Sequence, residues 1–275
     1  MFSQTSFHPS IFDSPLLRHH PTRSANSKQA NDGSTVAESK RRRKTVLAQL
    51  GVKASKTSVD EVVKAAIALA DEEGLEAVSM RRVADKLGIS AMSLYTYVPG
   101  KAELIELMVD SIAAETPLEP HVGTVRARLE NIARQQWAEF GRHPWLLQVD
   151  SSRPPLGPGV SDRYEWQLAA VEGLGLSDLE MDQTLTLLVS VVAGPARAAR
   201  AAQRTNESSG MSDRGWWEIN APLLEKVMDG GRFPLSGRVG QNVGELYNGA
   251  SASTLSFEFG LARVLDGIEQ LIASK

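Results

Sequence analysis

The residues from Val78 to Lys101 combine hydroxyl groups, positive charges and a glycine turn within a short stretch of chain. Hydroxyl groups hydrogen-bond to phosphates and base edges, and lysine and arginine bind phosphates as cations. This composition is suited to holding DNA rather than to breaking a covalent bond. The candidate contact residues are Ser79, Arg81, Ser90, Ala91, Met92, Ser93, Tyr95, Thr96, Tyr97 and Lys101.

Base contacts would come from the exposed face of one short helix in this stretch. Ala91 and Met92 offer only apolar contact, for example to a thymine methyl group. Ser93 can donate or accept a hydrogen bond, with Thr96 as a further candidate. The alternative for Met92 is a flexible surface side chain. Because these groups carry little hydrogen-bond information, they do not predict the DNA sequence that is bound.

Backbone contacts would come from residues on either side of that helix. Ser79 caps a helix and is also a phosphate-ligand candidate, because helix N-termini attract anions. Arg81 could reach a phosphate or a guanine. Tyr95 and Tyr97 would place hydroxyl groups against the DNA backbone, and Lys101 would add a cation. The alternative for both tyrosines is packing against the protein core.

Two short helices joined by a tight turn must position these groups. Ala84 is small enough for the helices to cross closely, Gly88 tolerates the positive φ of a turn, and Ser90 caps the second helix. Upstream, Ser58 and Glu61 form a capping box that starts another helix. The helices expected in this unit are 58–74, 80–87, 91–97 and 101–115.

The rest of the chain is also expected to be helical, because β-branched residues rarely alternate with polar ones. Gly194-Pro195 is expected to interrupt the longest helix, either as a simple kink or as a pocket wall or hinge. The further helices expected are 122–142, 161–173, 177–203, 212–228 and 254–273. The predicted fold class is therefore all-α, with a three-helix helix-turn-helix DNA-binding domain at 58–115 and a second helical domain at 121–275.

The net charge of −3 conceals an uneven distribution. Residues 1–57 carry ten basic and three acidic side chains, whereas the remainder carries twenty basic and thirty acidic ones. The N-terminal residues lack a sustained period, so we expect a disordered basic tail. Its Lys-Arg-Arg-Arg-Lys run at 40–44 has two interpretations. The first is a solvated tail, or even an over-extended gene start. The second is an arm that contacts DNA phosphates or the minor groove.

The composition excludes several other classes of site. Zero cysteines rule out a disulfide framework, a cysteine nucleophile and a cysteine-based zinc site. His121 and His143 are isolated, and the Gly-Pro-Gly at 157–159 lacks the lysine of a phosphate loop. No apolar run reaches the roughly 18 residues of a membrane span, and no signal peptide is recognisable. We expect a cytoplasmic protein with no membrane contact, no metal and no cofactor.

Residues 59–112 resemble the DNA-binding domain of the tetracycline-repressor (TetR) family. The resemblance is carried by GLEAVSMRRVADKLGISAMSLYTYVPGKAELIELMVD. It has a Ser or Thr cap, an A-x3-G-V-S-like turn, an L-Y-x-H-V/F-like helix end and a following lysine. Tyr97 stands where the family usually has histidine, and a phenol can bind a phosphate but cannot become cationic. SFEFGLARVLDGIEQLI is similar to the C-terminal part of tetracycline-repressor-like proteins.

Two long helices of the second domain are apolar on two faces, which implies burial on both sides. Paired with their symmetry mates, they would form a four-helix interface of a homodimer, and the alternative is a deep monomer core. A twofold dimer would place two recognition helices about 34–36 Å apart on a palindromic site in double-stranded DNA. The two rows on the last helix are Phe257, Leu261, Val264, Ile268 and Leu271, and Leu255, Phe259, Ala262, Leu265 and Ile272.

The resemblance implies a repressor that a small-molecule effector releases from its operator. Residues 121–275 would then be the helical ligand-binding and dimerisation domain, with the helix at 101–115 as the lever between the domains. The sequence does not predict the effector's identity. Candidate pocket residues are Trp137, Phe140 and Trp166, with Gln167 and Arg197 as polar groups. The alternatives are a ligand-independent or architectural DNA-binding protein and, with little support, an enzyme fused to a helix-turn-helix. Activation instead of repression also stays open.

Overall fold

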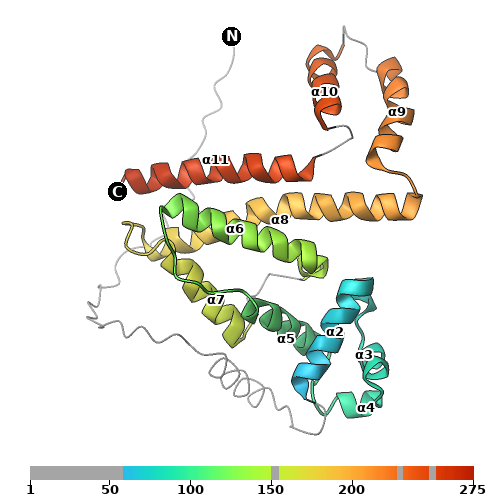
Figure 1. The fold of residues 1–275 in the computed structure, drawn as a ribbon, viewed down its shortest axis with the longest axis vertical. Coiled ribbons are helices and arrows are strands. Elements are labelled where there is room, and N and C mark those ends of the chain that lie inside the picture. The colour runs from blue at the N-terminus through green and yellow to red at the C-terminus, as the bar shows by residue number, and fades with distance from the viewer. Residues whose placement is uncertain (1–57, 150–154, 228–231, 248–251) are drawn as a thin grey trace, which may run out of the picture. The chain divides into compact units, whose positions relative to one another are not determined.

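A computed structural model describes residues 58–149, 155–227, 232–247 and 252–275 (Figure 1). The basic tail expected at 1–57 lies outside the described residues. Within them the regular structure consists of α-helices and short 3-10 turns, with no strand. The expected all-α class is thereby confirmed.

The first four α-helices begin and end close to the predicted residues. Ser58 and Glu61 form the expected capping box, and Gly74 follows the end of the first helix. The helix expected at 91–97 is shorter than predicted, because regular α-helix ends at Leu94 and residues 95–97 form turns. The bounds of these elements are α2 Val59–Glu73, η2 Leu75–Ala77, α3 Met80–Leu87, α4 Ala91–Leu94 and α5 Lys101–Ala114.

The remaining helices include one that the sequence pattern did not predict. The segment Pro234–Tyr247 is helical although it contains three glycines, which lower helix propensity. A Cβ atom on Gly244 would lie 2.9 Å from Cζ2 of Trp217, so the missing side chain allows close packing. The bounds are α6 Val125–Arg142, η3 Pro144–Gln148, α7 Pro158–Ala169, α8 Asp178–Ser209, α9 Asp213–Val227, α10 Pro234–Tyr247 and α11 Ser253–Ala273.

The longest helix corrects a second expectation. α8 continues through Gly194 and Pro195 to Ser209, so the predicted end near Gln203 is wrong, and Pro195 lies within the helix without ending it. Proline removes one backbone donor, but the hydrogen bonds on either side can maintain a helix of this length. α8 is also, among the described residues, the one helix that is long and apolar enough to cross a bilayer. Core helices of soluble proteins pass the same test, and α8 packs against both α6 and α11.

Two hydrophobic cores organise the described chain. The first is built by α2, α3, α4 and α5, and it also takes in Trp145 of η3, whose side chain is 1% exposed. The second is built mainly by α6, α7, α8 and α11. In Figure 1, α11 lies along α8, and α6 lies along the same helix. Two arginines on α6 join it to α11: Arg126 pairs with Asp266 and Glu269, and Arg134 with Glu258.

Candidate functional site

The helix-turn-helix forms because the turn residues satisfy its backbone demands. Gly88 has φ of 67°, in the left-handed region that glycine adopts at low cost, and it ends α3. Ala84 is fully buried, as expected for the residue at the crossing of α3 and α4. The Ser90 hydroxyl accepts a hydrogen bond from the Ser93 backbone N–H at 3.1 Å, and the Ser79 hydroxyl caps α3 in the same way. Both predicted caps are confirmed.

The outward face of α4 is available to a ligand. Met92 is 78% exposed although its side chain is large and apolar, and Ser93 is exposed beside it. The hydroxyl groups of Ser90 and Ser93 lie 2.8 Å apart, so they can share one hydrogen bond. The Thr96 hydroxyl donates to the Ser93 carbonyl at 2.7 Å, which leaves its lone pairs for a donor from outside. Ala91 is half-buried at the edge of the first core.

The two tyrosines after α4 have different environments. Tyr95 is half-exposed, as a contact to DNA requires. Tyr97 is only 6% exposed, and its ring is part of the first core. The expectation that both hydroxyls face the DNA backbone is corrected for Tyr97, because the turn after Leu94 directs this side chain inward. Its burial supports a packing role instead.

The cations of the unit are not equally free. Arg82 pairs with Glu73, and Lys86 with Glu72 at 2.8 Å, so α2 carboxylates neutralise both. The hydrogen bond from Arg82 lowers the pKa of the Glu73 carboxyl, which keeps this partner negative. Arg81 projects outward with a long contact of 4.0 Å to Asp85. The Lys101 ammonium donates to the Leu75 carbonyl at 3.5 Å and stays exposed.

One side chain of the second region belongs to the first core. Trp145 follows α6 directly, and its indole N–H donates to Oδ1 of Asp71 on α2 at 2.8 Å. Nδ1 of His143 donates to the same carboxylate oxygen at 2.8 Å. A second bridge joins α5 to α7, where Oδ1 of the buried Asp110 accepts from the Val160 backbone N–H at 3.0 Å. The helix-turn-helix is thus connected to two separate segments of the second region.

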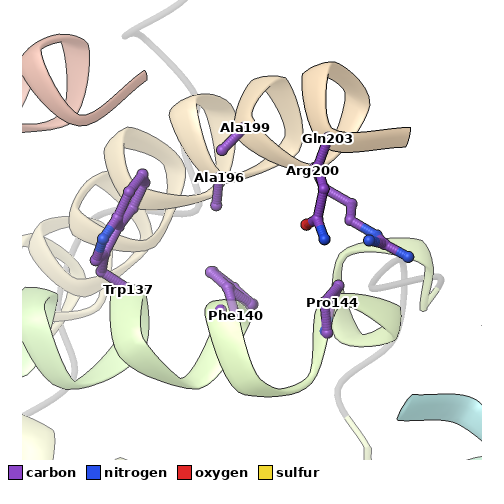
Figure 2. A pocket seen from close by; sticks show the side chains of 8 residues that line it. Trp137, Phe140, Pro144, Ala196, Ala199, Arg200 and Gln203 are labelled. Atoms are coloured by element: carbon purple, nitrogen blue, oxygen red, sulfur yellow. The ribbon is translucent and has the colours of Figure 1, made fainter. Parts of the chain in front are cut away.

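Two cavities lie on different faces of α6. The first, which we call the α8-side cavity, has a volume of about 150 Å³. Figure 2 shows aromatic rings from α6 facing small side chains of α8, with a guanidinium and an amide at one end. The Trp137 ring also stacks on Phe257 with centroids 4.5 Å apart. The lining residues are Trp137, Phe140, Gly141, Pro144, Ala196, Ala199, Arg200 and Gln203.

The second cavity, which we call the α7-side cavity, has a volume of about 220 Å³ and a more polar lining. The Arg163 guanidinium contributes to its wall and donates to the buried Glu139 carboxylate at 2.8 Å. The side-chain oxygens of Gln135 and Gln136 are buried without a hydrogen-bond partner in the part of the chain described. The lining residues are Thr116, Pro117, Ile132, Gln135, Gln136, Ala138, Glu139, Arg142, Arg163, Trp166 and Gln167.

The five residues predicted to line one pocket do not lie together. Trp137 and Phe140 line the α8-side cavity, whereas Trp166 and Gln167 line the α7-side cavity. The Trp166 indole N–H donates to the Glu119 carbonyl, so this ring also anchors the chain before α6.

Arg197 lines neither cavity, and its guanidinium donates to the Leu147 carbonyl at 3.4 Å. The polar residues that do line the α8-side cavity, Arg200 and Gln203, were not among the predicted ones. Their spacing from Ala196 and Ala199 places all four on one helical face, which is the signal that could have identified them.

Comparison with known proteins identifies both regions. Residues 56–108 match "Bacterial regulatory proteins, tetR family", and residues 116–272 match "Tetracyclin repressor-like, C-terminal domain". The chain is 42% identical over 221 residues to the HTH-type transcriptional repressor DrrR1 of Streptomyces coeruleorubidus, covering 79% of each chain. It is 23% identical over 232 residues to the tetracycline repressor protein class E of Escherichia coli, covering 80% of this chain and 95% of that one.

A solved structure shows the same fold in a relative with a bound small molecule. The complex of the Streptomyces coelicolor TetR family protein ActR with actinorhodin aligns with a TM-score of 0.64 at 26% identity, covering 78% of this chain and 96% of ActR. Among the described residues no cluster of His, Asp or Glu could hold a metal ion. These relatives are transcription regulators rather than enzymes. Because the C-terminal match alone spans more than half of the chain, the chain belongs to the TetR family of DNA-binding transcriptional regulators.

Proposed function

We propose that this protein is a cytoplasmic, homodimeric repressor that binds a palindromic operator and is released from it by a small-molecule effector. Residues 58–115 form the DNA-binding domain, and residues 121–275 bind the effector and dimerise. The observation that carries the proposal is the free outward face of α4, where Met92 is largely exposed beside the Ser93 hydroxyl. A large apolar side chain on a recognition helix can be removed from water by entering the major groove of DNA, where it contacts thymine methyl groups.

The proposed DNA contacts divide into two kinds. Met92, Ser93, Ala91 and Thr96 would face base edges, since they lie on or just after α4. The second kind, contacts to phosphates, would come from exposed cations, hydroxyls and helix N-termini around α4. The residues in this second group are Ser79, Arg81, Ser90, Tyr95 and Lys101.

The proposed dimer uses the apolar faces that the single chain leaves uncovered. On α11, Phe257 and Leu261 are buried in the second core, whereas Phe259 is 67% and Leu255 48% exposed. On α8, Leu187 is also exposed. Apolar surface of this extent on two adjacent helices supports a symmetric interface, in which each α8–α11 pair packs on its mate.

We propose the α8-side cavity as the effector site. Its wall includes Pro144, which lies between the two residues that hold Asp71 of the DNA-binding domain, His143 and Trp145. A ligand that moves the end of α6 would therefore act on α2 through these hydrogen bonds. The effector must favour the arrangement with misplaced recognition helices, since equal affinity for both arrangements would shift nothing. The actinorhodin complex of ActR supports a small-molecule effector for this chain.

Selection of bound sequences from random DNA, followed by footprinting, tests the DNA-binding part of the proposal. We expect an inverted repeat with half-sites separated by one helical turn, and one dimer bound to it in sedimentation. Ser93→Ala should change the ranking of the selected sites, because this hydroxyl is the polar group on the outward face of α4. Selection of no preferred sequence, or binding by a lone protomer, would contradict the proposal.

A further inference from the structure

The α8-side cavity combines an aromatic wall with a positive charge that no acidic side chain of the described residues neutralises. Trp137 and Phe140 supply two rings on the α6 side. Ala196 and Ala199 face them from α8, and their methyl groups leave room for a flat molecule between the two helices. Arg200 and Gln203 close one end of this space (Figure 2).

The state of Arg200 differs from that of the half-buried arginines Arg126 and Arg163. Arg126 and Arg163 each pair with a carboxylate within 2.9 Å. Arg200 is half-buried, and no acidic side chain among the described residues lies within ion-pair distance of it. A partly desolvated charge without a partner is costly, so an anion that enters this cavity would gain an interaction that the protein leaves unmade.

The size of the cavity restricts the ring system that can fit. A cavity of about 150 Å³ in another protein is known to hold a benzene molecule, and the α8-side cavity has about this volume. It is also partly open to solvent, so substituents on the enclosed ring can extend outward. One or two fused rings would occupy the space between the α6 aromatics and the α8 alanines.

The α7-side cavity does not favour an anion in the same way. Of its two arginines, the half-buried Arg163 is already neutralised by Glu139 at 2.8 Å, and Arg142 is exposed to solvent. The polar atoms buried there without a described partner are the side-chain oxygens of Gln135 and Gln136. These oxygens accept hydrogen bonds and carry partial negative charge, so they do not attract an anion. A half-buried guanidinium that no described carboxylate neutralises is therefore found in the α8-side cavity and not in the α7-side cavity, which favours an anion on the α8 side.

We propose that the α8-side cavity binds a planar aromatic anion, with its ring between Trp137 and Ala199 and its negatively charged oxygens on the Arg200 guanidinium. The Gln203 amide nitrogen, which donates to Glu207 at 2.8 Å, has a second N–H that can donate to the ligand at the same end. This inference rests on the proposed function, because it names the chemical class of the effector for the same cavity. A planar guanidinium suits this role, since it can donate two parallel hydrogen bonds to a carboxylate.

The test uses 2-naphthoate as the anionic probe and 2-naphthamide as its neutral isostere, titrated by calorimetry into the full chain. We expect 2-naphthoate to bind at least about tenfold more tightly than 2-naphthamide, because a charge-assisted pair replaces a neutral one. Arg200→Gln should remove about tenfold in 2-naphthoate affinity and leave 2-naphthamide unchanged. Arg204→Gln, one turn further along α8 and exposed, is the matched control and should change neither affinity.

A second variant tests the location independently of charge. Ala199→Phe should fill the space between the helices and abolish binding of both probes, while circular dichroism shows that the helices are retained. Equal affinity for the two probes, no binding of 2-naphthoate at millimolar concentration, or an unchanged affinity in Arg200→Gln would overturn the inference. Operator binding without any probe is measured in parallel. If the unmodified chain did not bind the selected operator, the proposed function would be refuted. A failure of probe binding with intact operator binding would refute only the inference about the effector.

Discussion

The DNA-binding unit and the region that follows it differ in how much of their apolar surface they leave exposed. The unit of α2 to α5 buries its apolar side chains in one core and exposes few large ones, notably Met92 and Tyr95. The helical region leaves exposed apolar residues along α8, α9, α10 and α11, and it has cavities on two faces of α6. The first unit therefore leaves little apolar surface uncovered apart from the α4 face, whereas the second has apolar surface left for another copy and for a ligand.

The sharpest exception to this contrast is Trp145, which comes from the second region and is buried in the first core. Trp145→Ala should destabilise the chain by about 3–5 kcal/mol, because it leaves a cavity and removes the donor to Asp71. Thermal unfolding and operator affinity measure the effect. Trp216→Ala, at a half-exposed position on α9, is the control and should cost far less. Similar losses in both variants would mean that Trp145 does not hold the two regions together.

The exposed apolar faces of the second region can be tested by charge. Phe259→Asp should weaken dimerisation by at least about 100-fold, since it removes an apolar ring from the proposed interface and forces a carboxylate there to lose its hydration. Sedimentation equilibrium measures the dissociation constant. Val122→Asp introduces the same charge at an exposed residue outside α8 and α11, and it should leave the dimer intact. A dimer that tolerates aspartate at 259 would place the interface elsewhere.

In the DNA-binding unit, the exposed cation at the start of α5 should act without sequence preference. Lys101→Ala is expected to weaken binding to all DNA sequences about equally and to reduce the salt slope of the affinity by about one unit. Titrations of the selected operator and of random DNA at several salt concentrations check both statements. Lys86→Ala is the matched control, because Lys86 is already paired with Glu72 and should contribute less. A change in site preference would instead assign Lys101 to base contacts.

Both regions begin a helix with a capping box, and the one in the second region has an additional partner. The Lys275 ammonium, followed by Ser177, lowers the pKa of Glu180 from 4.5 to about 2. Because the folded-state pKa lies below the unfolded value, the ionised carboxylate stabilises the fold above pH 4.5. This contribution is lost as the pH falls from about 4.5 to 2.

Unfolding of the chain and of Glu180→Gln between pH 7 and pH 2 measures that loss. The stability difference between the two proteins should shrink through this window. Glu61→Gln provides the comparison at the α2 capping box, where both hydrogen bonds of the box are present but no lysine of the described residues forms an ion pair with the glutamate. A difference that stays constant down to pH 2 would show that the Glu180 contacts do not stabilise the fold.

The sequence predicted the DNA-binding unit more closely than the second region. Caps at Ser58, Ser79 and Ser90 and the turn at Gly88 act over three or four residues, so their positions are visible in the sequence. The direction of Tyr97 was missed, because it depends on how far α4 continues before the chain turns. α10 was missed because its glycines oppose a helix locally and are favoured only by the packing of Trp217 on Gly244.

By itself the sequence determined the all-α class, the helix-turn-helix and the surface that α4 presents, because periodicity and capping are properties of neighbouring residues. Only the tertiary structure decided that Trp145 joins the first core, that the predicted pocket residues separate onto two faces of α6, and that Arg200 rather than Arg197 lines the α8-side cavity. These outcomes depend on contacts between residues distant in the chain. A helical repeat shows that a face is apolar, but it does not show which other helix will cover it.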